Sequence, residues 1–495
     1  MLRSLQKQKL VKMLSPENPP FKILILDSAT QEILGPILKV SDLRDAGVTA
    51  HFLASMSRSP IKDAPALYFV SSVESIEKDL NRDLYGSYYI NSSFAFKRSD
   101  LEKMAAVASG KQIALKIQSV FDQFLQFISL QDDLFTLNIT SSFTNRNTDA
   151  FLRRSVSGLM SVFCTLNEVP FIISKECELG KMLEQKIKNT KIIKGGIKKP
   201  LLIILNRDFD VSTPTKHVMG YVELIHDIFN IKLNKAENIN IDTDCEFYKT
   251  NMFLDFPTVA DTVNKELHAY KKELALRSLN EKSDKAQIQA ALESAPHLQK
   301  KSEIVNNNLT LCSKVLDQVK ERKMDDFYSM EENFDQNEIM ELCSCGTDND
   351  ILRLCIQLIG SKNSDLIEPI LQKRGIDSKI VNYFRKMIKN EQGFGAKVKS
   401  LLFKKSLPIY SQIESIFSQI KNQNFDGLEI YDPSYTGIYQ SEISRIVVYI
   451  NGGATYSELK SLKELEQVIK IPIVLGGSEI LNANEFIRQV SIENQ

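Results

Sequence analysis

The chain has 495 residues, with 62 basic and 62 acidic side chains and a formal net charge of zero. A chain of this length folds into several domains, because single hydrophobic cores stop growing well below it. Without net charge there is no global field to draw the protein to nucleic acid, so we expect no nucleic-acid partner. The seven cysteines are odd in number and scattered through apolar segments, which is typical of a reducing compartment.

Residues 1–14 carry four basic and no acidic side chains, and their leucines could share one face of a helix. Such a segment could be a transit peptide. It could also be an amphipathic helix that packs on the first domain, and we favour this interpretation. No run in the sequence approaches the roughly 20 apolar residues that span a bilayer, so no membrane anchor is expected.

The first third of the chain alternates short β-rich runs with helical periodicity. The runs at residues 22–27, 48–53 and 66–70 are apolar and have the length of strands. This alternation predicts a parallel sheet covered by helices. The same pattern resumes at 171–174 and 200–206.

From about residue 257 to 424 the pattern is almost wholly helical. Two apolar stripes stand out in this region: Val259, Val263, Leu267 and Tyr270, and then Val305, Leu309, Cys312, Leu316 and Val319. Strand patterns return at 445–450 and 471–475, and these late strands need a sheet to join. The nearest incomplete sheet ends before residue 250. The sequence therefore predicts an α/β fold with two parallel-sheet α/β domains and a mainly helical domain inserted in the second.

The sequence lacks the motifs that would indicate a nucleotide-binding site, a metal site or a catalytic site. The pairs Gly452-Gly453 and Gly476-Gly477 follow strands but lack the third glycine of a dinucleotide fingerprint, so we interpret them as sharp turns. Cys343, Cys345 and Cys355 lack zinc-ligand spacing, and Cys355 lies in an apolar run typical of core. We therefore predict no catalytic residue, no cofactor and no metal ligand, and a function other than catalysis. An α/β enzyme remains the alternative.

Fourteen residues, 186–199, hold a run of lysines without an acid. A phosphate-binding or membrane patch is one interpretation of such a run. A solvated loop is the interpretation that we favour.

The segment from Pro200 to Tyr221 resembles the signature of the Sec/Munc (SM) family of SNARE-binding vesicle fusion proteins. In that signature an apolar strand leads into Asp-Arg-x-x-Asp, followed by a proline, a histidine and a tyrosine. The matching residues here are Arg207, Asp210, Pro214, His217 and Tyr221, with Asn206 in the place of the first aspartate. We interpret this segment as internal bracing that identifies the family and makes no contact with a SNARE.

Further blocks resemble the Sly-one-like subfamily, which acts between the endoplasmic reticulum and the Golgi. These blocks occur in the subfamily's order and lie at residues 41–48, 65–70, 84–91, 120–128, 256–260, 446–453 and 476–483. The resemblance covers essentially the whole chain and implies a three-domain arch. The expected domains are 1–132, 133–248 with 432–495, and 249–431. The chain is short for the subfamily near 391–407, where relatives carry a regulatory lid, so regulation by a lid stays open.

The resemblance implies that the first domain holds the N-terminal peptide of a syntaxin-class (Qa) SNARE. We expect a helix at Gly110–Gln118, followed by a segment at 123–135, to form an apolar slot for one side chain of that peptide. The slot residues would be Ala114, Ile117, Phe127 and Leu130. The alternative is that these four residues are ordinary core.

The resemblance also implies that the helical domain aligns SNARE helices on a helix that begins at Pro296 and ends near Met324. The expected template residues are Pro296, Leu298, Lys301, Ile304, Val305 and Leu309. The alternative is that this helix face packs inside its own domain. The implied partners are the Qa-SNARE, its SNARE complex and an R-SNARE, and the protein would be a monomer, cytoplasmic and peripheral on ER-Golgi membranes. An adaptor without SNARE contact is a further alternative.

Overall fold

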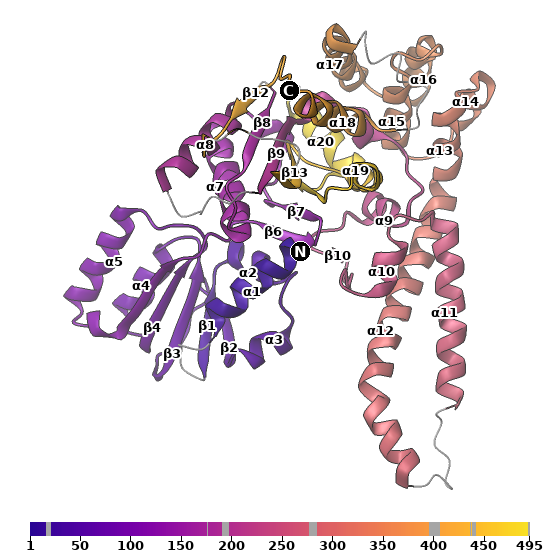
Figure 1. Cartoon of the computed structure of the whole chain (residues 1–495). Coiled ribbons are helices and arrows are strands. Elements are labelled where there is room, and N and C mark those ends of the chain that lie inside the picture. Colours follow the sequence, from indigo (N-terminus) through magenta and orange to yellow (C-terminus); the bar gives the residue numbers. More distant parts are fainter. Residues whose placement is uncertain are drawn as a thin grey trace. The chain divides into compact units, whose positions relative to one another are not determined.

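The computed structural model describes residues 1–15, 21–175, 177–190, 198–276, 285–395, 406–435, 437 and 442–493, with the side chains of 275–297 and 389–395 left out. The chain divides into two compact units (Figure 1). The first comprises 1–209, 406–454 and 461–480, and it holds both large sheets. The second comprises 210–405, 455–460 and 481–495 and is mostly helical.

The first sheet of the first unit has five parallel strands in the order β2-β1-β3-β4-β5. The strands are β1 (Lys22–Leu26), β2 (Val48–Leu53), β3 (Ile61–Val70), β4 (Tyr85–Ser92) and β5 (Ile117–Asp122). Every residue of β1 is buried, as expected for a central parallel strand covered on both faces. The helices around this sheet are α2 (Ser28–Leu34), α3 (Val40–Asp45), α4 (Glu74–Asn81) and α5 (Arg98–Gly110).

The second sheet has seven strands in the order β12-β8-β9-β13-β14-β7-β6. The strands are β6 (Ile128–Gln131), β7 (Leu134–Thr136), β8 (Phe171–Ser174), β9 (Lys199–Asn206), β12 (Glu429–Tyr431), β13 (Ile443–Asn451) and β14 (Ile473–Gly477). The five central strands run parallel, and the edge strands β12 and β6 are antiparallel. Helices α7 (Asp149–Leu166) and α8 (Glu178–Thr190) share one core with this sheet, and α6 (Ser142–Asn145) precedes them.

The late strands complete the second sheet, because β13 lies between β9 and β14. The predicted fold class, two mostly parallel α/β sheets with a helical insertion in the second, is confirmed. The boundary predicted at residue 132 is wrong in one respect: β6 at 128–131 pairs with β7 in the second sheet. Strand pairing decides which sheet a segment joins, and the sequence texture does not reveal pairing. The other domain boundaries stay predictions.

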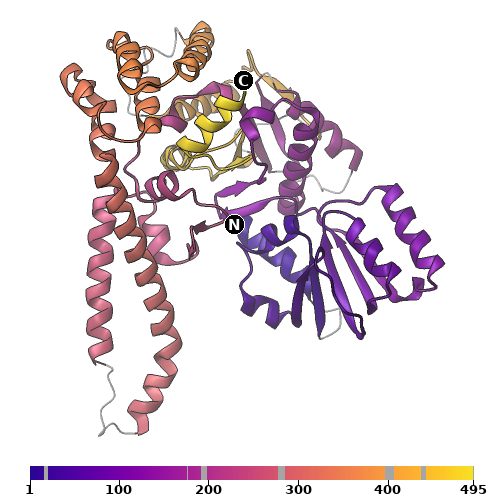
Figure 2. The ribbon, with the colours of Figure 1, turned by 180° about the vertical axis from the view of Figure 1, so that it is seen from behind.

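The second unit contains the helices of the insertion and a short ribbon, β10 (Lys235–Ala236) with β11 (Ile239–Asn240). Its helices are α9 (Tyr221–Phe229), α10 (Glu246–Asn251), α11 (Phe256–Leu276), α12 (Lys285–Arg322), α13 (Met324–Asn333), α14 (Gln336–Leu342), α15 (Asp348–Leu358), α16 (Ile367–Arg374), α17 (Lys379–Gly395) and α20 (Ala483–Glu493). Helix α18 (Pro408–Lys421) belongs to the first unit, and α19 (Tyr456–Ile469) to both. Figures 1 and 2 show α11 and α12 side by side as a long hairpin.

The N-terminal segment is a helix, α1 (Leu2–Leu14), as we favoured. It packs on β6, an edge strand of the second sheet, and on α7, a helix that shares a core with that sheet. The Gln6 side chain forms hydrogen bonds with the backbone at β6, as a neighbouring strand would. Its Nε2 donates to the Phe127 carbonyl at 2.6 Å, and its Oε1 accepts from the Ser129 N–H at 3.0 Å. These bonds satisfy backbone groups that an edge strand otherwise leaves unpaired.

The lysine run is not wholly a loop, so that prediction is wrong in part. Lys186 and Lys188 lie in α8, and the Lys188 ammonium is 2.9 Å from the Glu184 carboxylate one turn earlier. An apolar face on α8, with Leu179, Leu183 and Ile187 buried, explains why the helix extends into the run. Residues 191–197 lie outside the described residues.

The two glycine pairs serve different needs. Gly452 and Gly453 have φ of +101° and +105°, so the predicted turn that needs glycine is confirmed there. Gly476 lies inside β14, and a Cβ built on it would be 2.0 Å from Cζ of Phe135. The prediction of a turn is wrong for this glycine, because it makes room for an aromatic ring on the neighbouring strand.

Gly476→Ala should destabilise the protein by about 3 kcal/mol or more, because the Phe135 ring must move out of a packed core. Gly110→Ala is the matched control: it ends α5 with no atom within 4 Å of the added Cβ, and its stability should change little. Chemical unfolding of the two variants checks this. A Gly476→Ala protein as stable as the control would contradict the close packing.

Candidate functional site

The outer edge of the five-stranded sheet carries an exposed apolar surface. Strand β5 pairs only with β4, so its other side is free of a ladder among the described strands. Leu101 on α5 is 41% exposed, Val120 on β5 is 40% exposed, and Leu115 on the turn between these elements is 94% exposed. We call these three residues the edge patch. A free strand edge flanked by large apolar side chains can accept an extended peptide.

The four predicted slot residues do not come together. The helix expected at 110–118 is wrong, because α5 ends at Gly110 and a short 3₁₀ turn at Ala114–Lys116 leads into β5. Ala114 is exposed on that turn, and Ile117 is half-buried against the core that contains Met104 of α5. These two residues lie at the sheet edge.

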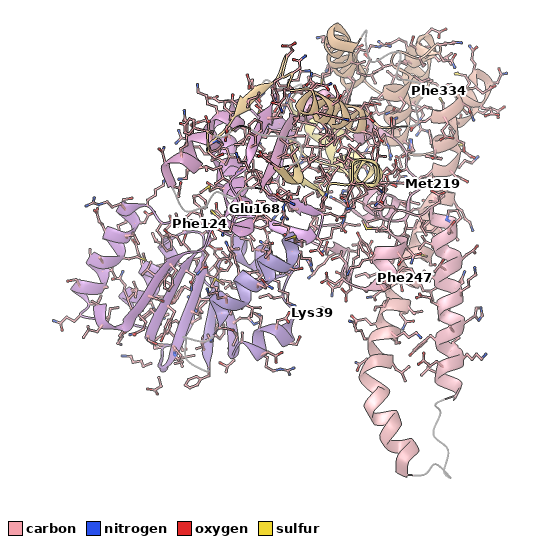
Figure 3. All side chains as sticks on the ribbon, in the orientation of Figure 1. Lys39, Phe124, Glu168, Met219, Phe247 and Phe334 are labelled. Carbon is pink, nitrogen blue, oxygen red and sulfur yellow. The ribbon has the colours of Figure 1, made fainter. Side chains whose placement is uncertain are left out.

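The other two predicted slot residues are core. Phe127 is buried and its ring meets that of Phe135 edge to face, with centroids 6.1 Å apart. Leu130 is buried on β6, where Arg3 donates to its carbonyl. The alternative of ordinary core holds for this pair. Figure 3 labels Phe124, which begins the buried segment that follows the exposed strand β5.

The residues that the sequence reasoning missed are Leu101 and Val120. Strand alternation counted from Ile117 could not have found Val120, because the pairing of β5 with β4 shifts between Ile117 and Ser119 and so brings Val120, rather than Phe121, to the face of Ile117. Leu101 and Met104 are three apart on α5, which places them on neighbouring positions of one helix face.

The first part of the signature closes the carboxyl end of β9. Arg207 is fully buried, and its Nη1 donates to the Gly453 carbonyl at 3.2 Å. Asn206 accepts a hydrogen bond at 3.0 Å from the Asn451 side chain on β13. Arg146 pairs with Asp208 at 3.0 Å. These contacts tie the strand end to its neighbours, as expected of internal bracing.

The second part of the signature anchors a buried polar cluster in the second unit. Nδ1 of His217 is 2.5 Å from Glu331 on α13, and its Nε2 is 3.3 Å from Asp350 on α15. The His217 ring also stacks on Phe327, with centroids 4.9 Å apart. Arg322, at the end of α12, donates to both oxygens of Asp350. We call His217, Arg322, Glu331 and Asp350 the anchor cluster.

A second buried arginine extends this bracing. Arg353 on α15 is fully buried and donates to the carbonyls of Thr215 and Lys216 at 3.0 and 2.7 Å. It also pairs with Asp227 on α9 at 2.8 Å. The backbone of the signature is therefore held directly by the helix that carries Asp350. Breaking such a buried pair costs much more than breaking a surface pair.

Burial opposes ionisation of Asp350, but hydrogen bonds from His217 and Arg322, with the charges of Arg322 and Arg353, hold the pKa of this carboxyl far below its usual range. A depressed pKa means that the contribution to stability is present above the unfolded pKa of about 4 and is lost as the pH falls below it. The anchor cluster is therefore sensitive to acid.

The long hairpin carries the predicted template residues, with one correction. Helix α12 begins at Lys285, so Pro296 lies in its interior and does not start it; the Pro296 side chain lies outside the described ones. Val305 is buried, as the alternative of packing inside its own domain expects. Leu298, Ile304 and Leu309 are half-buried, and Lys301 pairs with Glu273 of α11 at 2.7 Å. Figure 3 places Phe247 of α10 beside this hairpin.

The described residues were also compared with the requirements of a metal site and of a reactive thiol. No three His, Cys, Asp or Glu side chains of the described residues are grouped as metal ligands would be. Burial raises the pKa of the Cys355 thiol to about 12 and also raises that of Cys343, so both thiols stay protonated as core residues do. Within the same residues no helix is long and apolar enough to cross a membrane.

Comparison with known proteins finds relatives that all carry the description of one family. The model of the Sec1 family matches residues 22–442 and 438–489. A protein described as SEC1 family transport protein SLY1, from Encephalitozoon cuniculi (strain GB-M1), is 44% identical over 514 residues that cover 99% of each chain. A protein of the same description from Arabidopsis thaliana is 27% identical over 608 residues, covering 99% of this chain and 96% of its own.

Two solved structures share the fold. The crystal structure of Sly1p in complex with an N-terminal peptide of Sed5p has a TM-score of 0.83 at 23% identity, covering 100% of this chain and 98% of that one. The SM protein Vps45 in complex with the Qa SNARE Tlg2 (1–310) has a TM-score of 0.83 at 20% identity, with the same coverage. The fold of both extends over this entire chain.

Replacing Asp350 by Asn should destabilise the protein by about 3–5 kcal/mol, because Arg322 and His217 lose their shared carboxylate inside the core. Below about pH 4, the free energy of unfolding of this variant should also fall less steeply with decreasing pH than that of the parent protein, because the carboxyl with the depressed pKa is gone.

Urea unfolding at pH 7 and pH 3.5 measures both effects. Asp348→Asn is the matched control: this side chain is mostly exposed and pairs with Arg374 at 3.1 Å, so its loss should cost less than about 1 kcal/mol. Equal costs for Asp350→Asn and the control would refute the anchor cluster.

Proposed function

Because the chain belongs to the Sec1 family, we propose that it regulates SNARE assembly and membrane fusion in vesicle transport between the endoplasmic reticulum and the Golgi, without catalysis. Its partner is a syntaxin-class (Qa) SNARE, recognised first through an N-terminal peptide. The relative Sly1p, which binds an N-terminal peptide of Sed5p, supports this partner class. The transport step rests on the relatives described as SLY1.

The observation that carries the proposal is the edge patch on α5 and β5. An extended peptide can pair its backbone with the free edge of β5, and its apolar side chain can enter between α5 and β5. Ile117 and Val120 lie on the strand face turned toward α5, because they pair with Tyr88 and Ile90 of β4, which belong to the same buried core as Met104 of α5. Ala114 and Ile117 remain in the proposed site, and Leu101 and Val120 replace Phe127 and Leu130.

A short peptide buries little area, so one or two anchors carry most of its affinity. Val120→Asp should weaken binding of the Qa-SNARE N-terminal peptide at least tenfold, because a charge would replace the apolar wall of the slot. Fluorescence anisotropy with a labelled peptide measures the affinity, and the thermal unfolding midpoint should stay near that of the parent, since Val120 is 40% exposed on an edge strand.

Phe121→Asp is the control for this experiment. Phe121 lies on the same strand and is 59% exposed, but it points to the opposite face of β5 from Val120. Its peptide affinity should equal that of the parent. A Val120→Asp protein that binds as tightly as the Phe121→Asp protein would sink the proposed site.

The second part of the proposal concerns the long hairpin. We propose that α12 holds segments of a Qa-SNARE and an R-SNARE side by side, which removes part of the entropy cost of ordering them. Leu298, Ile304 and Leu309 offer half-buried apolar surface to such helices. The protein would act as a monomer in the cytoplasm and reach ER-Golgi membranes through its SNAREs.

Ile304→Asp should slow SNARE assembly about fivefold or more in a liposome fusion assay, because a charge in the contact stripe must be desolvated. Peptide binding at the sheet edge should be unaffected. Asn306→Asp is the control, since Asn306 lies on an exposed side of the same helix. Equal fusion rates for the two variants would remove the template function and leave peptide binding in place.

A further inference from the structure

Helix α1 is held to the second sheet of the first unit by three kinds of side chain. Leu2 is buried in the core that this sheet shares with α7. The Gln6 amide bonds to the backbone at β6, as described above. Lys9 donates from Nζ to the Cys164 carbonyl of α7 at 2.7 Å. An apolar contact, an amide and an ammonium therefore fix α1 on one side of the second sheet.

The same helix is also bonded to elements of the first sheet. Nζ of Lys7 is 3.0 Å from Oδ2 of Asp42 on α3. Lys22, the buried first residue of β1, donates from Nζ at 2.6 Å to the Leu14 carbonyl at the end of α1. These contacts reach the first sheet at β1 and at α3, the helix that packs on the edge strand β2.

Arg3, in the first turn of α1, bonds to both sides with a single guanidinium. Its Nη1 donates to the carbonyls of Ser129 and Leu130 on β6, at 2.7 and 3.3 Å. Its Nη2 donates at 2.7 Å to the carbonyl of Pro36, in the turn between α2 and α3. Arg3 is 8% exposed, so these bonds are made largely away from water. The planar guanidinium carries its N–H groups in a fixed fork, which allows it to bond to two separate backbone segments at once.

The chain itself connects the two sheets at the opposite edge of the first one. Residues 123–127 lead from the edge strand β5 directly into β6. Gln126 in this connection donates to the Ser93 hydroxyl at 3.2 Å. A further contact, from the Asn138 side chain to Glu32 at 2.7 Å, lies in an exposed position. The connection and α1 thus hold the first sheet at its two different edges.

We propose that Arg3 is a positioning residue that fixes the orientation of the first sheet relative to the second. A sheet held only through residues 123–127 could pivot there, because a short connecting segment can absorb changes of its backbone angles. The apolar contacts of α1 are non-directional and tolerate such a movement. The bonds of the guanidinium are directional, and a pivot would leave buried carbonyls without their charged donor, which is costly.

The orientation of the first sheet matters for a partner that is bound at two places. This consequence rests on the function proposed above, in which the first sheet binds the N-terminal peptide of the Qa-SNARE and α12 binds a helical segment of it. Binding at one place favours binding at the other, and the gain falls when the two places move relative to each other. Arg3 therefore strengthens binding of the whole SNARE without contacting it.

The test is Arg3→Met, which keeps an unbranched side chain and removes the donors. Lys12→Met is the matched control, since Lys12 lies on an exposed side of α1 and its replacement removes the same charge. Spin labels are attached at Lys103 on α5 and Lys181 on α8, both exposed, through an introduced keto-bearing amino acid that spares the native cysteines. Pulsed electron resonance then measures the distance between the two labels in the free protein.

We expect one narrow distance distribution in the parent and in Lys12→Met, and a broader or shifted distribution in Arg3→Met. Affinity for the isolated Qa-SNARE N-terminal peptide should be unchanged, because β5 lies at the far edge of the sheet from β2. Affinity for the whole cytosolic part of the Qa-SNARE should fall about fivefold or more in Arg3→Met alone. Lys7→Met disturbs the same tie at a partly exposed ion pair, and its distribution should also broaden.

An unchanged narrow distribution in Arg3→Met, or in Lys7→Met where Arg3→Met does not fold, would overturn the positioning role. A broader distribution with parent affinity for the whole SNARE would overturn the link between orientation and binding. Neither result bears on the proposed peptide site, which fails if Val120→Asp binds the peptide as tightly as Phe121→Asp. The distance measurement needs no SNARE, so these failures are distinguishable.

Discussion

The buried carboxylate of Asp350 is the constraint on which the second unit depends. A charge without water must be surrounded by donors, and here they come from three separate places: Arg322 ends α12, His217 belongs to the signature, and Thr347 caps α15 through its N–H at 2.9 Å. Apolar packing could hold these elements in several arrangements. A carboxylate accepts hydrogen bonds only along certain directions, so it allows far fewer arrangements. It therefore fixes the orientation of each element around Asp350 as well as its distance.

The sheets illustrate what a single sequence can predict. Buried parallel strands such as β9 and β13 are continuous apolar runs, and the late strands lack a sheet of their own, so the split second domain could be deduced. Short edge strands carry no such signal. Strand β5 has an irregular burial pattern and β6 only four residues, and their membership depends on pairing with residues distant in sequence. The first two residues of β5 were accordingly expected to end a helix, and β6 was expected in the first domain.

In the candidate sites, too, some features could be predicted from the sequence and others depend on contacts between distant residues. Family resemblance directed the expected peptide site to residues 110–135, and choosing residues for the proposed site required knowing which face of β5 meets α5. On α12 the sequence offers two overlapping apolar stripes, and periodicity alone does not show that Asn308 has a partner. That partner is the hydroxyl of Tyr221, 87 positions away. Polar contacts between distant residues are the part of a fold that composition and period leave undetermined.

The contact between α11 and α12 changes character along its length. Near Val259 and Val263 it is apolar and buried, whereas toward the far end it includes Glu266, Glu273 and Lys301. Burial raises the pKa of Glu266, and the nearby charge of Lys301 opposes that rise. Partly exposed ion pairs are screened by salt, and apolar contacts are not. Added salt is therefore expected to weaken the charged part of this contact and to leave the apolar part intact.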